Sequence, residues 1–158
     1  MTSEYVSMLR QALERKEDFL ELLLMRCKEQ TVILKDNKST PEQLDENIAQ
    51  KGELIDKINI LDEGFETLFK NVESELQKHR ENYADEISQM KAYIRHITDL
   101  TAEIEAVEHR NKVYATSRFA TIRREAKEIK KSGDVVSAYY RGAMGAGPDD
   151  PQFFDNKN

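Results

Sequence analysis

Residues 38–43 read KSTPEQ, and this short stretch separates two helical segments because it carries the signals of a helix start. Thr40 is a favoured N-cap residue, Pro41 suits the first helical position, and Gln43 completes a capping box with the cap residue. Asn37, just before the stretch, is a residue type that often ends helices. The sequence therefore predicts that one helix ends near residue 37 and that another begins at residue 41.

The segment 2–37, upstream of this stretch, contains neither Gly nor Pro and has apolar residues at helical spacing. Its predicted core face comprises Leu9, Leu13, Leu20, Leu24, Cys27 and Leu34, with Leu23 and Ile33 beside them. We expect one amphipathic helix that buries this face. Cys27 is the only cysteine, so we expect no intrachain disulfide and a small buried side chain.

The segment 41–78 has apolar residues at steps of three and four, as in a coiled-coil seam. The seam comprises Leu44, Ile48, Lys51, Ile55, Ile58, Leu61, Phe65, Phe69, Val72 and Leu76, with Lys51 as its polar exception. Gly52 and Gly64 lie inside the segment, and each costs about 1 kcal/mol relative to Ala in a helix. They mark either a close approach between helices or tolerated weak positions.

The segment 83–131 continues the pattern and contains no Gly or Pro. Its seam comprises Ile87, Met90, Ile94, Ile97, Ile104, Val107, Tyr114 and Ile122. The polar stretch 78–82 predicts a turn before it, although the periodicity nearly continues, so one very long helix is the alternative. At the far end, two lysines precede Gly133, which predicts a helix end there.

These segments predict an all-α fold, an elongated antiparallel bundle of about three long, coiled-coil-like helices over residues 1–132. Residues 133–158 differ in composition, with Gly and Pro concentrated after residue 141. We expect a short helix to about Ala143 and then a mobile apolar tail. The grooves of such a bundle are suited to binding a partner helix.

The bulk properties exclude several classes of protein. The chain has 158 residues, which fits one domain, and its net charge of −6 argues against nucleic-acid binding and against attachment to anionic lipid. No stretch approaches the roughly 20 apolar residues of a membrane span. The opening residues lack the layout of a secretory signal, so we expect a soluble cytoplasmic protein.

Motifs for catalysis or metal binding are not found. His79, His96 and His109 are not spaced i, i+4, and none follows a Glu by three residues, so the sequence predicts neither a helical two-His metal pair nor a di-iron bundle. The glycine-rich stretch 142–147 lacks the Lys-Ser/Thr of a phosphate-binding loop. We expect no enzymatic activity, no cofactor and no metal.

Basic residues dominate the stretch from Arg110 to Lys131. The candidate docking patch, for an acidic partner or for nucleic acid, comprises Arg118, Arg123, Arg124 and Lys127. The alternative interpretation is a helix end whose cations complement the helix dipole.

The end of the chain carries apolar residues that the bundle does not need. The candidate partner-binding residues are Val135, Val136, Tyr139, Tyr140, Met144, Phe153 and Phe154. Tyr, Phe and Met are residue types that interfaces favour. Two roles stay open, because such a tail can cover the bundle or bind a partner.

The end of the chain also carries a resemblance to a known family. Residues 137–140 read SAYY, a glycine-rich link follows, and residues 150–157 read DPQFFDNK. With this ending, the helical chain resembles the FlgN-like flagellar export chaperones, in particular those of Gram-positive bacteria. Lys57, Asp62, Phe65 and Asn111 are compatible with the family's loose pattern.

The resemblance implies a cytosolic chaperone without catalytic residues. Such a chaperone binds the C-terminal helical segments of hook–filament junction proteins, prevents their premature assembly and delivers them for export. The export apparatus is then a further partner. In the family the C-terminal part binds the client, which here points to the apolar residues from Val135 onward.

Two other functions compete with this one. A structural coiled-coil or scaffold protein would dimerise through the helix seams, and the sequence leaves monomer and homodimer open. An enzyme or ligand-binding bundle would need polar residues inside the core, where we find only Lys51 and Asn111.

Overall fold

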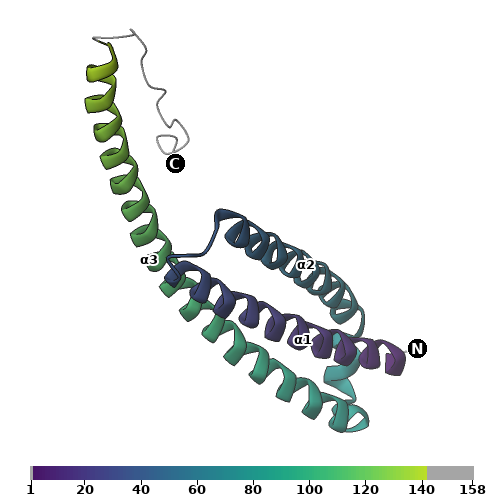
Figure 1. Ribbon diagram of the computed structural model, residues 1–158. Helices are drawn as coiled ribbons and strands as arrows, with labels where there is room; N and C mark the ends of the chain where they lie inside the picture. The colour runs from purple at the N-terminus through teal and green to yellow at the C-terminus, as the bar shows by residue number, and fades with distance from the viewer. Residues whose placement is uncertain (1, 142–158) are drawn as a thin grey trace. The chain divides into compact units, whose positions relative to one another are not determined.

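The chain folds into three long helices, as the computed structural model shows (Figure 1). The structure describes the backbone of residues 2–141 and, within it, the side chains of residues 3–131. Helix α1 spans Thr2–Lys35, α2 spans Pro41–Lys78, and α3 spans Ala84–Arg141. A 3-10 turn, η1, spans Arg80–Tyr83 between α2 and α3. The predicted all-α helical bundle is confirmed.

The turn between α1 and α2 has the predicted capping box. The Gln43 N–H donates to the Thr40 hydroxyl oxygen at 3.3 Å, and the Thr40 N–H donates to Gln43 Oε1 at 2.8 Å. Ser39 donates its hydroxyl to the Ile33 carbonyl at 2.6 Å, which satisfies an end carbonyl of α1. Helix α1 ends at Lys35, two residues before the predicted end, and α2 begins at Pro41 as predicted.

The turn between α2 and α3 excludes one very long helix. Helix α2 ends at Lys78, and the N–H of its C-cap residue His79 donates to the Glu75 carbonyl at 3.0 Å. The 3-10 turn follows at once, and none of its residues is buried. Apart from Tyr83, which is half-buried against the core, the residues of the turn are polar and exposed, so the apolar stripe of α2 does not continue through it.

The helix end predicted at Gly133 is wrong, because α3 continues to Arg141. A glycine weakens a helix by only about 1 kcal/mol relative to Ala, so one glycine inside so long a helix does not by itself end it. The chain divides into two compact units, Met1–Lys112 and Val113–Asn158, and not at residue 132. We call them the N-terminal and C-terminal units.

The core of the N-terminal unit is built around α1. This helix packs along α2, and its Cys27 carbonyl, Glu17 and Lys28 contact side chains of α3. The predicted core residues of α1 are all buried except Ile33, which is half-buried. The buried apolar residues of α2 and α3 are Leu54, Ile58, Val72, Leu76, Met90, Ile97, Leu100, Ile104 and Val107.

The seams of α2 and α3 depart from the predicted core. Ile48, Ile55, Phe69 and Ile94 were expected in the core, but their side chains are exposed. Helix α2 buries Asn47 and Leu54 instead. The predicted seam residues Lys51, Ile58, Val72 and Leu76 are buried, so the seam is covered in part and its remaining residues stay in contact with solvent.

The two glycines of α2 are not close-approach positions. A Cβ added at Gly52 or Gly64 would meet no atom within 4 Å. They are therefore tolerated weak positions, the second of the two interpretations above. Among the described helices, none is long and apolar enough to cross a membrane.

Candidate functional site

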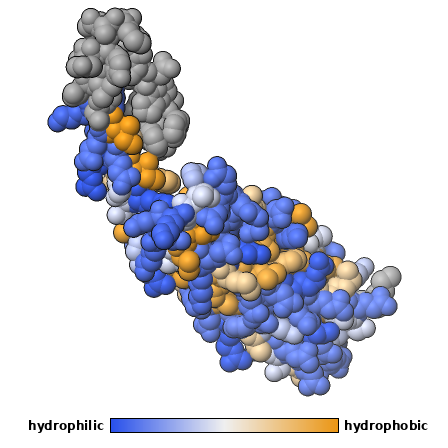
Figure 2. Space-filling view, in the orientation of Figure 1, coloured by the Kyte–Doolittle hydropathy of each residue, from blue (hydrophilic) through white to orange (hydrophobic). Residues whose placement is uncertain are grey.

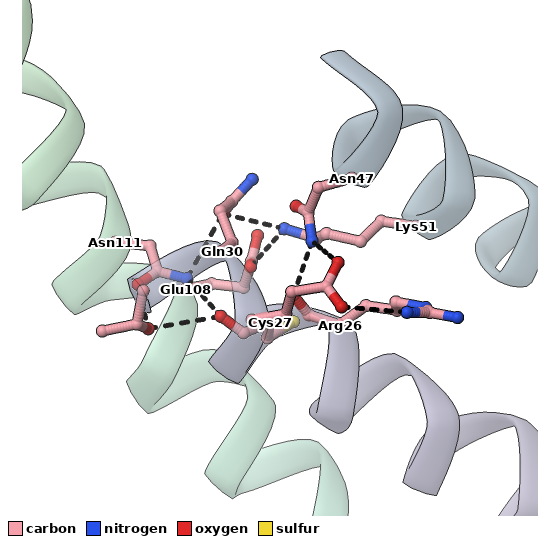
Figure 3. Close-up of polar contacts among 9 residues, drawn as sticks. Arg26, Cys27, Gln30, Asn47, Lys51, Glu108 and Asn111 are labelled. Carbon is pink, nitrogen blue, oxygen red and sulfur yellow. Dashed lines mark hydrogen bonds and ion pairs between the residues drawn. The ribbon is translucent and has the colours of Figure 1, made fainter. Parts of the chain in front are cut away.

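The two polar residues of the predicted seams come together inside the N-terminal unit. Lys51 on α2 and Asn111 on α3 are 8% and 2% exposed, and both face α1 (Figure 3). Five polar residues from all three helices meet here, and we call them the polar cluster: Gln30, Asn47, Lys51, Glu108 and Asn111.

Gln30 on α1 links the other two helices. Its Oε1 accepts from Lys51 Nζ at 3.1 Å and from Asn111 Nδ2 at 3.2 Å. Lys51 also forms an ion pair with Glu108 of α3, while Asn111 Nδ2 donates to the Cys27 carbonyl at 2.8 Å. Buried polar groups are costly unless paired, so these contacts favour one axial alignment of the three helices.

Asn47 adds a second connection between α1 and α2. Its Nδ2 donates to the Arg26 carbonyl at 2.9 Å and to Glu29 Oε1 at 3.1 Å, and Glu29 in turn pairs with the Arg26 guanidinium at 3.0 Å. The Asn47 side chain is only 1% exposed. This end of the α1–α2 interface is therefore held by hydrogen bonds as well as by apolar packing.

The buried thiol beside the cluster is not an activated nucleophile. The pKa of Cys27 is raised to about 12, first by burial and then by its hydrogen bond with Glu108, and this value already includes the lowering by the Lys51 charge. The thiol is fully buried, as predicted. Because a thiolate is the reactive form, this cysteine has a packing role.

Glu17, Glu21 and His96 form the one group that could offer ligand atoms to a metal among the residues described. Their ligand atoms lie within 4.8 Å of one another, and His96 Nδ1 is 2.9 Å from a Glu17 carboxylate oxygen. Glu21 and His96 are exposed. Glu17 is half-buried, the three groups are fewer than the four ligands of a structural zinc site, and an ion pair accounts for the proximity of His96 and Glu17.

A groove lies between α2 and α3 in the N-terminal unit. One part is lined by Leu61 and Phe65 of α2, Ile94 of α3 and Leu13 of α1, and the adjoining part by Phe65, Phe69 and Ile94 with Ile87 and Met90. The rings of Phe65 and Phe69 stack with centroids 6.1 Å apart. On the face that Figure 2 presents, apolar surface likewise remains visible between hydrophilic side chains.

The groove was missed because the sequence pattern assigned its lining residues to the core. A signal was present, since Ile48, Ile55, Asp62 and Phe69 follow at intervals of seven and so share one face of α2. The charged Asp62 in that line indicated that the face is not fully buried.

The predicted docking patch lies in the C-terminal unit. The side chains of Arg123, Arg124 and Lys127 are exposed, and Arg118 is half-buried. Val135, Val136, Tyr139 and Tyr140 fall within the helical backbone of α3, beyond the last side chain that the structure describes. Met144, Phe153 and Phe154 lie outside the described residues.

Comparison with known proteins places the chain in a family. The family model described as FlgN protein matches residues 1–144, which is most of the chain. Searches of the curated proteins and of the solved structures return no match. The chain therefore belongs to the FlgN protein family, a family of flagellar export chaperones.

Proposed function

We propose that this protein binds the C-terminal helical segments of hook–filament junction proteins in the cytoplasm, keeps them from assembling prematurely and delivers them to the export apparatus. The family match over residues 1–144 carries the proposal, because its members are flagellar export chaperones. The junction proteins as clients follow from the resemblance noted in the sequence.

The end of α3 supports the client-binding part of the proposal. Because α3 is helical to Arg141, positions 135, 136, 139 and 140 recur at i, i+1, i+4 and i+5 and share one helix face. All four are apolar or aromatic, as Val135, Val136, Tyr139 and Tyr140. Such a stripe is suited to pairing with the apolar face of a client helix.

The energetics suit a chaperone that must release its client. Burying apolar surface contributes roughly 25 cal/mol per Å², but ordering a client segment subtracts from this gain. The net affinity is therefore moderate for the area buried. The client can then be released to the export apparatus by simple dissociation.

The test uses the full chain and a labelled peptide comprising the C-terminal segment of a junction protein. We expect the double variant Val136→Ser, Tyr140→Ser to bind about tenfold more weakly by fluorescence anisotropy, because two interface side chains are lost. The control is Met25→Ser, which changes an exposed apolar residue of α1. Equal binding by the double variant and the control would show that the client does not use this end of α3.

The basic patch has a proposed role of its own, docking an acidic partner. Arg123, Arg124 and Lys127 are exposed and therefore accessible to such a partner. Changing all three to Gln is expected to weaken docking to the export apparatus and to reduce its dependence on salt. Unchanged docking at low salt would show that these three cations are not the docking contact; they also lie more than three turns before the end of α3, too far to complement the helix dipole there.

A further inference from the structure

Among the residues described for the N-terminal unit, no side chain fills the groove between α2 and α3. The ion pair of Lys51 and Glu108 joins α2 to α3 beyond one end of the groove, and η1 joins the two helices at its other end. Along α2 its lining runs from Leu61 to Gln77, which is about 24 Å at 1.5 Å per residue. This length equals about four turns of a helix.

Large apolar side chains line this position and remain in contact with solvent. Phe69 is 38% and Ile94 is 48% exposed, although both belong to the seams of their helices. Helix α1 packs against both α2 and α3, so one more helix in the groove between α2 and α3 would give a bundle of four helices.

We propose that a client helix docks in the α2–α3 groove and completes a four-helix bundle. This inference rests on the proposed function and adds a second contact site for the same client. The occupant is an amphipathic helix of about four turns with apolar residues three and four apart, which meet Phe65, Phe69 and Ile94.

The charges at the rim define the occupant further. Arg80 and Lys91 line the groove at its η1 end, and Glu73 lies on the α2 rim. An acidic residue in the client helix would face the two cations, while a basic residue would face Glu73. Such complementary pairs fix the orientation of a docked helix more than they add to its affinity.

The end of the chain itself fits the groove less well than a client helix. Residues 142–158 contain glycines and prolines, and their longest stretch free of both is 152–158, about 10 Å of helix. That is less than half the length of the groove. A second copy of the chain as the occupant is tested below through the oligomeric state.

The test compares full-length variants that bind the labelled client peptide. Phe69→Glu with Ile94→Glu places two charges in the groove at positions that are already partly exposed, so the helices are expected to stay folded by circular dichroism. We expect about a tenfold or larger loss of affinity. The matched control Met25→Glu, at a 56% exposed position of α1, is expected to change affinity less than twofold.

A second measurement maps the contact without adding charge. A photo-crosslinking phenylalanine analogue at position 69 is expected to capture the peptide, while the same analogue at position 25 is not. Binding that survives the groove variant, without capture at position 69, overturns this inference alone. The proposed function then still stands if Val136→Ser, Tyr140→Ser weakens binding.

The remaining outcomes separate the other occupants. If the wild-type chain does not bind the peptide, the proposed function fails and this inference fails with it. If light scattering shows a wild-type dimer that the groove variant converts to monomer, the groove joins two copies instead. A chain that ends at Arg141 tests the tail as the occupant. The tail is the occupant if this shorter chain binds the peptide more tightly than the full chain and if Phe69→Glu with Ile94→Glu changes the affinity of the full chain alone.

Discussion

Lys51 on α2 and Glu108 on α3 form an ion pair, and the same ammonium group donates to Gln30 on α1 at 3.1 Å. One side chain thus contacts both other helices of the N-terminal unit. The Lys51 side chain is 10% exposed, whereas that of Glu108 is 44% exposed. The lysine, more than the glutamate, depends on these partners because it is the buried member of the pair.

Glu108→Gln is expected to lower the free energy of unfolding by about 1 kcal/mol, since solvent still reaches this end of the pair. Lys51→Met, which keeps the length and removes the charge, is expected to be nearly neutral. Urea denaturation measures both variants. Glu66→Gln, in the exposed Lys70–Glu66 pair, is the control and should stay within about 0.5 kcal/mol of wild type. A cost for Lys51→Met above that of Glu108→Gln would contradict this account.

Gly52→Ala and Gly64→Ala are each expected to stabilise the protein by up to about 1 kcal/mol. The helix gains the better propensity of Ala, and the added Cβ meets no atom within 4 Å at either position. The two gains should add, because the sites lie more than three helical turns apart. Thermal and urea unfolding measure them, and Ala49→Gly, at an exposed position of the same helix, is the inverse control. Destabilisation by either Gly→Ala change would reveal a contact at that site.

The His96–Glu17 pair is expected to make stability depend on pH. The hydrogen bond to Glu17 is the main cause that raises the pKa of His96 above 6.5, with smaller contributions from the charges of Glu17, Glu21 and Asp99. A histidine pKa raised by folding stabilises the folded state fully below the unfolded value. That contribution is lost as the pH rises above 6.5 through the folded pKa.

Glu17→Gln tests this dependence. It should lower the melting temperature more at about pH 5.5 than at about pH 8.5, because only protonated His96 gains from the carboxylate. His79→Gln is the control, since His79 lies at 4.0 Å from Glu75 in an exposed i, i+4 pair. An equal loss at both pH values would mean that Glu17 stabilises the protein through packing instead of charge.

Cys27 is expected to resist thiol reagents in the folded protein. Its side chain is fully buried, and burial raises its pKa to about 12, so almost no thiolate is present at neutral pH. Absorbance after addition of a disulfide reagent should rise only on unfolding in guanidinium. Ser88→Cys, at an exposed position of α3, should add one thiol that reacts at once. Rapid labelling of the wild-type chain would show that this part of α1 opens readily.

Local signals in the sequence determined the ends of the first two helices. A capping box is made by residues three apart, so the start of α2 at Pro41 follows from Thr40 and Gln43 whatever else the chain does. The all-α class and the buried face of α1 follow likewise, because α1 packs against both other helices and its predicted apolar stripe is buried apart from Ile33. Family membership was also anticipated, through the residues at the end of the chain.

Tertiary structure alone decided which residues of the other two helices are buried. Periodicity shows that a helix has an apolar face, but the number and placement of its neighbours decide how much of that face is covered. Phe69 and Ile94 are therefore exposed beside a groove, while Asn47 is buried. The pairing of Lys51 with Glu108 and of His96 with Glu17 joins residues 57 and 79 positions apart, which no local pattern encodes. The continuation of α3 through Gly133 likewise reflects the summed hydrogen bonding of its neighbours against the small cost of one glycine.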